Sequence, residues 1–251
     1  PYRLYRDDPC WVPPLRFERT MFFDRRKNPF FEHGEADYFI CYRDGRPIGR
    51  ITAHIDYNYD AYHKTRHGFF GFFECENDPE AAQALIAAAE NWLKARRYER
   101  IIGPMNFTTN HDSPGFTIEG LDVVPVLMNP HTMPYYPSFF RAAGYRDEQI
   151  LNSWILEEPE DLPPEFHERD ERLCAKYGDR LVVRHIDLKN LRNDVETILT
   201  IFNEAWSENW GYVPMTEREI TAMADELKLI VDLPLTYLVF LDGAPAAFMV
   251  G

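Results

Sequence analysis

The chain has 251 residues, of which 45% are hydrophobic and 15% aromatic, so it carries enough apolar surface for a packed core and is not a disordered chain. Its 27 Lys and Arg against 41 Asp and Glu give a formal net charge of −14. This acidic balance argues against a protein whose main work is binding nucleic acid, because neutralising phosphates needs a surplus of Lys and Arg.

The cysteines and the ends of the sequence indicate its compartment and its completeness. Cys10, Cys41, Cys75 and Cys174 lie far apart with no CxxC pair, which excludes a zinc ribbon and leaves no basis for a disulfide scaffold. We expect no signal peptide, because the first residues are polar, aromatic and interrupted by prolines, and no membrane helix, because no apolar run is long enough. We therefore expect a cytoplasmic protein. Because the chain opens on Pro1 and closes inside an apolar run, we also expect a fragment of a longer chain.

The first part of the chain predicts a β-hairpin and a further strand. Prolines in residues 1–35 leave room only for short helices. Residues 37–55 read as a hairpin around an Asp44-Gly45 turn, and a polar loop over residues 56–67 follows. Residues 68–75 (GFFGFFEC) form a strand too rich in aromatics to face water.

A helix follows, with clear start signals. Asp78 is a good N-cap and Pro79 suits the first helical position, after which apolar residues recur at helical spacing to about residue 97. A short buried strand at residues 100–104 completes a βαβ-like unit. Beyond it we predict a polar segment at 106–120, a strand at 123–129, a helix at 135–143 and a strand at 149–156.

The composition then changes, which indicates a boundary. Residues 157–164 (EEPEDLPP) are acidic and proline-rich, and a short amphipathic helix follows at 165–177. The remainder predicts a strand at 181–186, helices at 194–206 and 217–229, a strand at 235–241, an Asp-Gly turn and a strand at 245–250. An Asp-Gly hairpin after a helical region repeats the layout of residues 1–55, so we predict a weak internal duplication.

Several motifs give the sequence a resemblance to a known superfamily. PYYPSFFRAAGY (134–145) is similar to the late, aromatic-rich helical motif of GNAT acyltransferases. GFFGFFE, GPMNFTTN and FNEAWSENWGYVP look like a bacterial double-GNAT group that includes ceramide-synthase-like acyltransferases. The resemblance implies an α/β (α+β mixed) fold, with a GNAT-like mixed β-sheet and flanking helices in residues 1–156 that lack the first strand. It implies a linker and short helix at 157–179, and the N-terminal half of a second GNAT-like domain at 180–251.

Two departures from that pattern bear on the co-substrate. The resemblance implies that a glycine-rich loop before the Ala-rich helix holds the CoA pyrophosphate, yet residues 74–80 (ECENDPE) contain no glycine and four carboxylates. Phe140 stands where acetylating members often carry a tyrosine as general acid, and phenylalanine has no proton to donate. We therefore expect residues 1–156, the first GNAT-like copy, to have lost the loop that holds the pyrophosphate. The acyl-CoA or acetyl-CoA co-substrate is then expected to be bound mainly by residues beyond 251.

The polar segment after residue 103 holds the first group of candidate site residues. His111 beside Asp112 is a predicted catalytic pair that could deprotonate an amine. Asn106, Asn110 and Glu119 are predicted to bind the substrate, since loops at strand ends commonly form the site of a mixed α/β fold. The alternative is an Asx-rich loop whose side chains satisfy its own backbone.

A second group of candidates is aromatic. Tyr135 and Tyr136 could bind substrate, with core packing as the alternative. Trp206, Asn209 and Trp210 could form a wall for an acyl chain or acceptor, with a capped helix–helix corner as the alternative. Glu74 could be a base with a raised pKa if it is buried, or a solvated strand end.

A possible metal set is set aside at this stage. His54, Asp56, Asp60, His63 and His67 include donor types that metals use. Their segment reads as a hairpin loop, so we expect no metal.

We predict an acyl-CoA-dependent N-acyltransferase in which an amine attacks a thioester. The acceptor is expected to be a small-molecule or lipid-like amine, with a long-chain amine as one candidate. Nucleic acid is not an expected partner. A peripheral enzyme that contacts a membrane is a further alternative, although the net charge of −14 does not support it. The alternative is a non-catalytic ligand- or protein-binding module on a degenerate GNAT scaffold.

Overall fold

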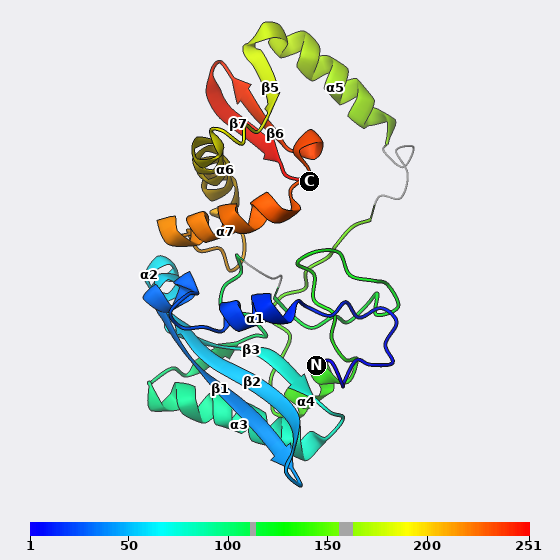
Figure 1. Ribbon diagram of the computed structural model, residues 1–251, viewed down its shortest axis with the longest axis vertical. Coiled ribbons are helices and arrows are strands. Elements are labelled where there is room, and N and C mark those ends of the chain that lie inside the picture. The colour runs from blue at the N-terminus through cyan, green and yellow to red at the C-terminus, as the bar shows by residue number, and fades with distance from the viewer. Residues whose placement is uncertain (111–113, 156–162) are drawn as a thin grey trace. The chain divides into compact units, whose positions relative to one another are not determined.

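A computed structural model describes residues 1–110, 114–155 and 163–251 of the chain. The chain forms two compact units (Figure 1). Unit 1 comprises residues 1–151 together with Gly211–Val213, and unit 2 comprises residues 152–210 and 214–251. The two units are described separately below.

Unit 1 is built on a four-stranded mixed sheet. Its strands are β1 (Gly34–Arg43), β2 (Arg46–Asp56), β3 (His67–Cys75) and β4 (Arg100–Ile102), in the order β1-β2-β3-β4. The first three strands are antiparallel, and β4 runs parallel to β3. Asp44 and Gly45 both have positive φ in the β1–β2 turn, as the predicted Asp-Gly hairpin requires.

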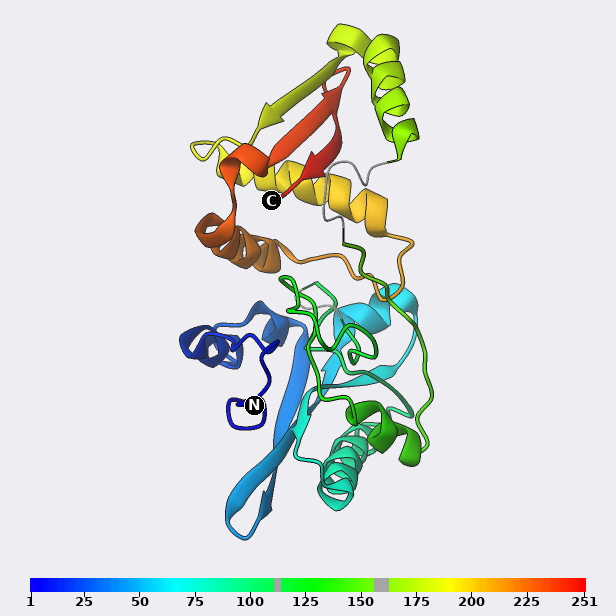
Figure 2. The ribbon, with the colours of Figure 1, turned by 90° about the vertical axis from the view of Figure 1, so that its right-hand side faces the viewer.

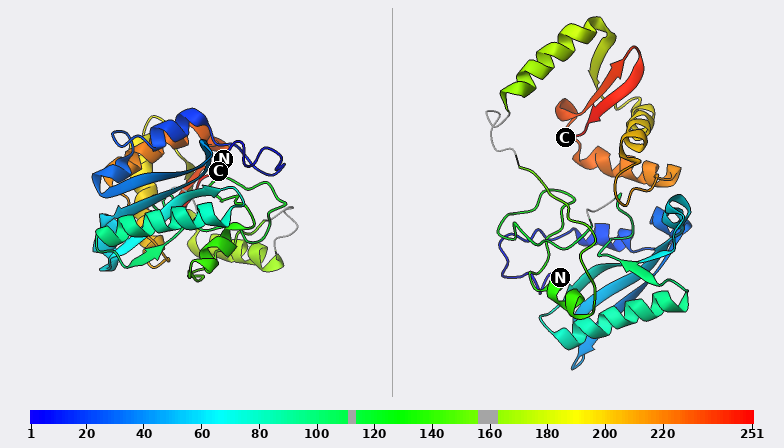
Figure 3. Two further views of the ribbon diagram at one scale, coloured as in Figure 1. Left: turned by 90° about the horizontal axis from the view of Figure 1, so that it is seen from below. Right: turned by 180° about the vertical axis from the view of Figure 1, so that it is seen from behind.

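Helix α3 (Pro79–Ala95) connects β3 to β4 and lies along one face of this sheet (Figure 3). The Asp78 carboxylate accepts a hydrogen bond from the Ala81 amide at 3.1 Å, so the predicted N-cap is confirmed. The apolar stripe of the helix packs on Ile51, Ala53 and Ile55 of β2. Helix α4 (Tyr136–Ala142) joins the same core.

The opposite face of the sheet is covered by aromatic residues. Helix α1 (Arg16–Phe22) and the short 3-10 helix η1 (Pro29–Glu32) lie on this side, away from α3 (Figure 2). Phe107 is fully buried here and stacks on Phe30 with ring centroids 4.6 Å apart. The same face also carries the polar side chains of β2, which alternate with its core residues Ile51, Ala53 and Ile55.

Three of the predicted elements are wrong. Residues 56–67 are not simply a loop, because Asp56 accepts hydrogen bonds from the Asn58 and Tyr59 amides and starts helix α2 (Tyr57–His63). Residues 123–129 form turns, held by the hydrogen bond from the Asn129 amide to the Val126 carbonyl. Residues 149–155 form neither a strand nor a helix. In each case the apolar or polar composition of the segment did not predict its backbone hydrogen bonds.

The described part of unit 2 contains a three-stranded antiparallel sheet and three helices of 14 to 16 residues. Its elements are α5 (Pro164–Tyr177), η3 (Gly178–Arg180), β5 (Leu181–His185), α6 (Leu191–Trp206), α7 (Glu217–Ile230), η4 (Leu233–Leu235), β6 (Tyr237–Leu241) and β7 (Ala244–Met249). The strand order is β5-β6-β7, and α6 lies beside this sheet (Figure 2). Arg184 of β5 forms two hydrogen bonds to the buried Asp194 of α6, at 2.6 and 2.9 Å, and so ties strand to helix.

The predicted fold class is confirmed, because both units combine helices with β-sheet and the sheet of unit 1 is mixed. The turns of both hairpins carry Asp followed by Gly at positive φ, at Asp44-Gly45 and Asp242-Gly243. The predicted domain boundaries and the internal duplication stay predictions.

Candidate active site

The direction of the Glu74 side chain is set by a bulge in β3. Thr52 of β2 pairs with Gly71 and Arg50 pairs with Glu74, so Phe72 and Phe73 together oppose a single residue of β2. Phe72 has a φ of 47°, which is uncommon for a bulky residue. Because side chains alternate along a strand, the extra residue turns Glu74 to the face opposite α3. Without the bulge its carboxylate would point into the apolar core.

The bulge is held by the chain that follows β4. The Phe72 amide donates a hydrogen bond to Asn106 Oδ1 at 2.9 Å, and the Met105 amide donates to the Phe70 carbonyl at 2.8 Å. The chain passes so close that a Cβ on Gly71 would lie 1.9 Å from the Met105 carbonyl oxygen. Glycine is therefore required at position 71 by this close approach.

Glu74 lies in a polar centre built from four parts of unit 1. Tyr136 of α4 donates a hydrogen bond from its hydroxyl to Glu74 Oε2 at 2.9 Å, while the same hydroxyl accepts one from the Cys75 amide at 3.0 Å. Arg50 Nη2 of β2 lies 3.8 Å from Glu74 Oε1. The ring of Tyr5 is buried beside this pair. We call Tyr5, Arg50, Glu74 and Tyr136 the Glu74 centre.

Burial dominates the electrostatics of the Glu74 centre. The Glu74 side chain is 19% exposed, and its burial raises the pKa of the carboxyl, against the opposing effect of Arg50. Burial likewise lowers the pKa of Arg50 and raises the pKa of Tyr5 and of Tyr136. A carboxylate in such a setting takes up a proton more readily than an exposed one, which is the property that a general base near neutral pH needs.

The other three carboxylates of the segment 74–80 behave differently. Glu76 forms ion pairs with Arg3 and Arg46 at 2.8 and 2.7 Å. Arg43 reaches both Asp78, at 2.7 Å, and Glu80, at 3.2 Å. The pKa of Asp78 is lowered, chiefly by the Ala81 amide that it caps. The start of α3 is thus occupied by protein carboxylates and their arginine partners, and its residues do not fit a pyrophosphate.

The predicted asparagines have structural partners within unit 1. Asn106 supports the bulge, as described above. Asn110 is buried and its Nδ2 donates to the Val213 carbonyl at 3.2 Å, next to the bond from Thr109 Oγ1 to the Gly211 carbonyl at 2.9 Å. Glu119 lies exposed on the loop beyond them. His111 and Asp112, the predicted catalytic pair, lie outside the residues that the structure describes. The substrate-binding roles stay predictions.

The aromatic candidates fall into two places. Tyr136 is fully buried, so it can affect a substrate only through Glu74. Tyr135 donates its hydroxyl to the Cys75 carbonyl at 3.0 Å, and burial raises its pKa to about 12. Trp206, Asn209 and Trp210 belong to unit 2, where all three are exposed and Phe202 stacks on Trp206 with centroids 5.1 Å apart.

The residues of the set-aside metal set each have another role or environment. His54 is fully buried among phenylalanine rings, and burial lowers its pKa to about 3. Asp60 accepts hydrogen bonds from the His67 amide and the Tyr98 hydroxyl. His63 Nε2 donates to the Tyr212 carbonyl at 2.8 Å. Within residues 1–110, 114–155 and 163–251, no group of three or more His, Cys, Asp or Glu side chains is arranged to hold a metal ion.

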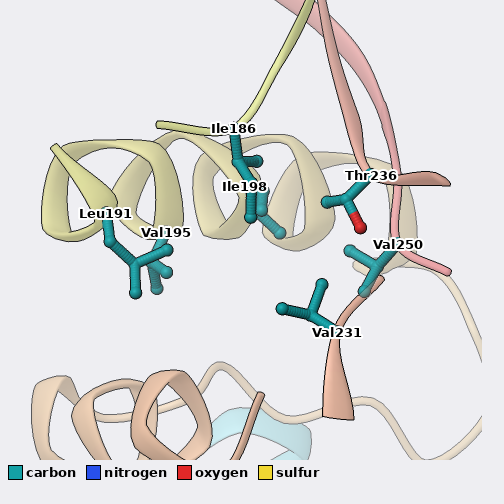
Figure 4. A pocket seen from close by; sticks show the side chains of 7 residues that line it. All are labelled: Ile186, Leu191, Val195, Ile198, Val231, Thr236 and Val250. Carbon is teal, nitrogen blue, oxygen red and sulfur yellow. The ribbon is translucent and has the colours of Figure 1, made fainter. Parts of the chain in front are cut away.

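Unit 2 contains an apolar pocket (Figure 4). Aliphatic side chains from the end of β5, helix α6 and the chain on either side of β6 and β7 form its walls. They are Ile186, Leu191, Val195, Ile198, Val231 and Val250, together with Thr236. The Thr236 hydroxyl is already bonded to the Asp232 carbonyl at 2.9 Å. The pocket is small, with a cavity volume of ≈ 20 Å³ that has room for about one water molecule, and its lining offers no charged group to a phosphate.

Of the Glu74 centre, the sequence analysis predicted Tyr136 as a substrate-binding residue and considered Glu74 as a base. Arg50 and Tyr5 were missed altogether. A polar residue inside an otherwise aromatic strand was the available signal, but a bulge that turns it toward Arg50 cannot be read from a single sequence.

None of the helices in the described part of the chain has the length and apolar character needed to cross a bilayer.

Comparison with known proteins adds two relatives. The chain is 35% identical along its whole length to the protein YghO of Escherichia coli K12, and 35% identical along its whole length to the bacterial ceramide synthase of Caulobacter vibrioides. It spans 63% and 64% of the length of these two proteins. No protein-family model matches the chain.

Solved structures show only a distant likeness. An aminoglycoside acetyltransferase from an uncultured soil metagenomic sample, in complex with trehalose, has a TM-score of 0.36 and 9% sequence identity, over 62% of this chain and 83% of that one. A TM-score of this size supports no argument about function. The resemblance indicated by the three sequence motifs is confirmed by the relatives instead: the chain is homologous, along its whole length, to the protein named bacterial ceramide synthase.

Proposed function

We propose that the protein is an N-acyltransferase that moves an acyl group from an acyl-CoA to an amine, with Glu74 as the general base. The observation that carries the proposal is the Glu74 centre, in which a largely buried carboxylate with a raised pKa is held by the Tyr136 hydroxyl. The name of the Caulobacter relative supports a long-chain amine as the acceptor. We propose the cytoplasm as the location, in keeping with the four separated cysteines.

The chemistry asks little of the protein beyond position and one proton. The neutral amine nitrogen forms a bond to the thioester carbonyl carbon, and the carbon–sulfur bond breaks. The proton lost by the nitrogen passes to Glu74 and then to the departing thiolate, so none is gained or lost overall. Glu74 suits this role because its pKa is raised from the usual glutamate value toward neutral pH, which makes it a stronger base.

Among the four carboxylates of residues 74–80, Glu74 is favoured by its surroundings. Glu76, Asp78 and Glu80 are paired with arginines at the surface, and the pKa of Asp78 is lowered. A carboxylate with a lowered pKa is a weaker base. Tyr136 fixes the direction of Glu74, and we assign it as a positioning residue because its buried hydroxyl contacts Glu74 and the Cys75 amide.

We also propose a division of labour between the two predicted copies. The residues at the start of α3 do not fit the pyrophosphate of CoA, which supports acceptor binding in residues 1–156 and co-substrate binding elsewhere. Residues beyond 251 are then expected to hold the CoA moiety.

A second candidate is a non-catalytic binding module. The carboxylates at the start of α3 favour it, as does Phe140, which stacks on Phe70 at 4.5 Å in the core and offers no proton. Titration of the full-length protein with acetyl-CoA and palmitoyl-CoA, followed by calorimetry or thermal shift, separates the two. An absence of response to both would favour the binding module.

The direct test replaces the proposed base in the full-length protein. Glu74→Gln keeps the size of the side chain and its hydrogen bond from Tyr136, but it cannot take the proton, so kcat should fall by about 10²–10⁴-fold. The matched control is Glu76→Gln, two residues along and ion-paired at the surface, which should keep kcat within about threefold. An acyl-transfer rate that survives Glu74→Gln, or falls equally in both variants, would rule out Glu74 as the base.

A further inference from the structure

Residues 1–14, which we call the strap, form a closed loop on unit 1 (dark blue in Figure 1). The Tyr2 hydroxyl donates a hydrogen bond to the Pro14 carbonyl, so the two ends of the strap meet. Tyr5 is the most buried side chain of the strap, at 1% exposed, and its ring stacks on that of Trp11 with centroids 5.1 Å apart. The strap therefore carries one aromatic ring into the interior of the unit.

Polar contacts fasten the strap to the rest of unit 1. His131 Nε2 donates to the Asp8 carboxylate at 2.8 Å, and the His131 side chain is only 5% exposed. At the surface, Arg3 donates to the Pro47 carbonyl at 2.7 Å and pairs with Glu76 at 2.8 Å. Exposed ion pairs contribute little to stability, whereas the loss of one partner of a buried pair is costly. We therefore expect the Asp8–His131 pair to be the main fastening.

The fastening is close to Tyr5, and Tyr5 is close to Glu74. The ring of His131 lies 6.1 Å from that of Tyr5, centroid to centroid. The charged and titratable groups that act on the pKa of Glu74 include Arg50 of β2, Tyr136 of α4, and Tyr5 and the Pro1 amino group of the strap. The strap thus forms one side of the Glu74 centre.

We propose that Tyr5 is a positioning residue, whose ring the strap holds beside Glu74 to keep water from the carboxylate. The proposal rests on the proposed function, in which Glu74 takes the proton of the amine. Burial is the largest cause of the raised pKa of Glu74. If the strap is released, water reaches the carboxylate, and its pKa should fall toward that of an exposed glutamate. Glu74 would then be a weaker base.

The test is the titration of the Glu74 carboxyl in the full-length protein, followed by carbon-13 NMR with labelled glutamate. The signal of Glu74 is the one that the Glu74→Gln variant lacks. Asp8→Ala and His131→Ala each remove the main fastening, so both should move the titration to lower pH. Asp7→Ala is the matched control: it removes the same charge from the neighbouring, exposed residue and should leave the titration in place.

The two strap variants also separate water access from a direct effect of charge. Loss of a nearby carboxylate by itself lowers the pKa of Glu74, while loss of a nearby cation raises it. Release of the strap predicts a lower pKa in Asp8→Ala and in His131→Ala alike. Asp8 is 26% exposed, so we expect the Asp8→Ala variant to fold.

Tyr5 itself is tested by removing its hydroxyl and its ring in turn. The hydroxyl lowers the pKa of Glu74, so Tyr5→Phe, which keeps the ring, should not move the titration to lower pH. Tyr5→Ala removes the ring and should do so. If Tyr5→Ala does not fold, the comparison of Asp8→Ala and His131→Ala with Asp7→Ala decides the question.

Three results would overturn the proposal: no change of the titration in Asp8→Ala and His131→Ala, changes of opposite sign in these two, or an equal change in Asp7→Ala. Acyl transfer is measured separately in the same proteins. A lower pKa in both strap variants, together with undiminished transfer by Glu74→Gln, contradicts the proposed function alone. Loss of transfer in Glu74→Gln without any change of the titration in the strap variants contradicts the role of the strap alone.

Discussion

Ionisation of Glu74 works against folding, because burial raises its pKa in the folded state above the value of an exposed glutamate. The sign of the pH dependence follows from this direction. A group with a raised folded-state pKa contributes stability at low pH, and this contribution is lost as pH rises through the folded pKa. The side chain that would serve as base is therefore one that the fold tolerates at some cost.

Glu74→Gln should consequently unfold at a higher temperature than the wild type at pH 8, because the variant has no buried carboxylate to ionise. The difference should shrink as pH falls through the raised pKa of Glu74, because the carboxyl is then protonated and uncharged. Thermal unfolding of both proteins across this pH range measures it. A Glu74→Gln variant that is less stable at pH 8, or a difference that does not change with pH, would show that Glu74 is not held in a raised-pKa setting.

Residue identity predicted some of these roles and not others. Asp78 was predicted as an N-cap, and the structure confirms it, because the signal is local: a capping residue, a proline and a helical pattern follow one another in the sequence. Asn106 and Asn110 were predicted to bind substrate, whereas the partners that they have in the structure lie 34 and 103 residues away in the chain. Contacts of that separation depend on the finished fold, and no local pattern reports them.

At the scale of elements, the proposed division of labour depends on the start of α3, where protein carboxylates occupy the position at which a pyrophosphate would dock. Asp78→Ala removes the acceptor for the Ala81 amide and should lower Tm by about 2–4 °C. The Tm of the Asp78→Asn variant should fall less, since asparagine is as good an N-cap as aspartate. Glu80→Ala, at a side chain that is 84% exposed, is the matched control and should leave Tm unchanged. An equal loss in the Asp78→Ala and Glu80→Ala variants would argue that the arginine pairs and not the cap hold this helix end.

The elements themselves differ in how far the sequence foretold them. Strand β3 and helix α3 were predicted because a dense aromatic run and a capped, periodic stretch are strong signals. Helix α2 was missed, since Tyr, Asn and His carry no apolar period and its start depends on the Asp56 cap. The strand predicted at 123–129 is wrong, because these apolar residues form turns and have no strand partner.

At the scale of the whole molecule, one feature is common to both units: each couples strands to helices through a small number of polar contacts in an apolar setting. The Glu74 centre does this in unit 1, and the Arg184–Asp194 pair does it in unit 2. The relatives, of whose length this chain spans 63% and 64%, make the full-length protein the proper object of functional tests. The division of labour proposed above can be measured only there.

The pH dependence of kcat in the full-length enzyme, at saturating amine and acyl-CoA, tests the central claim most directly. The Tyr136 hydroxyl stabilises the Glu74 carboxylate, so Tyr136→Phe should raise the pKa of Glu74 further and move the acidic limb of the profile to higher pH. Tyr135→Phe, whose hydroxyl donates to the Cys75 carbonyl instead, should leave the limb in place. An acidic limb that Tyr136→Phe does not move, or that both variants move equally, would contradict the assignment of Glu74 as the base.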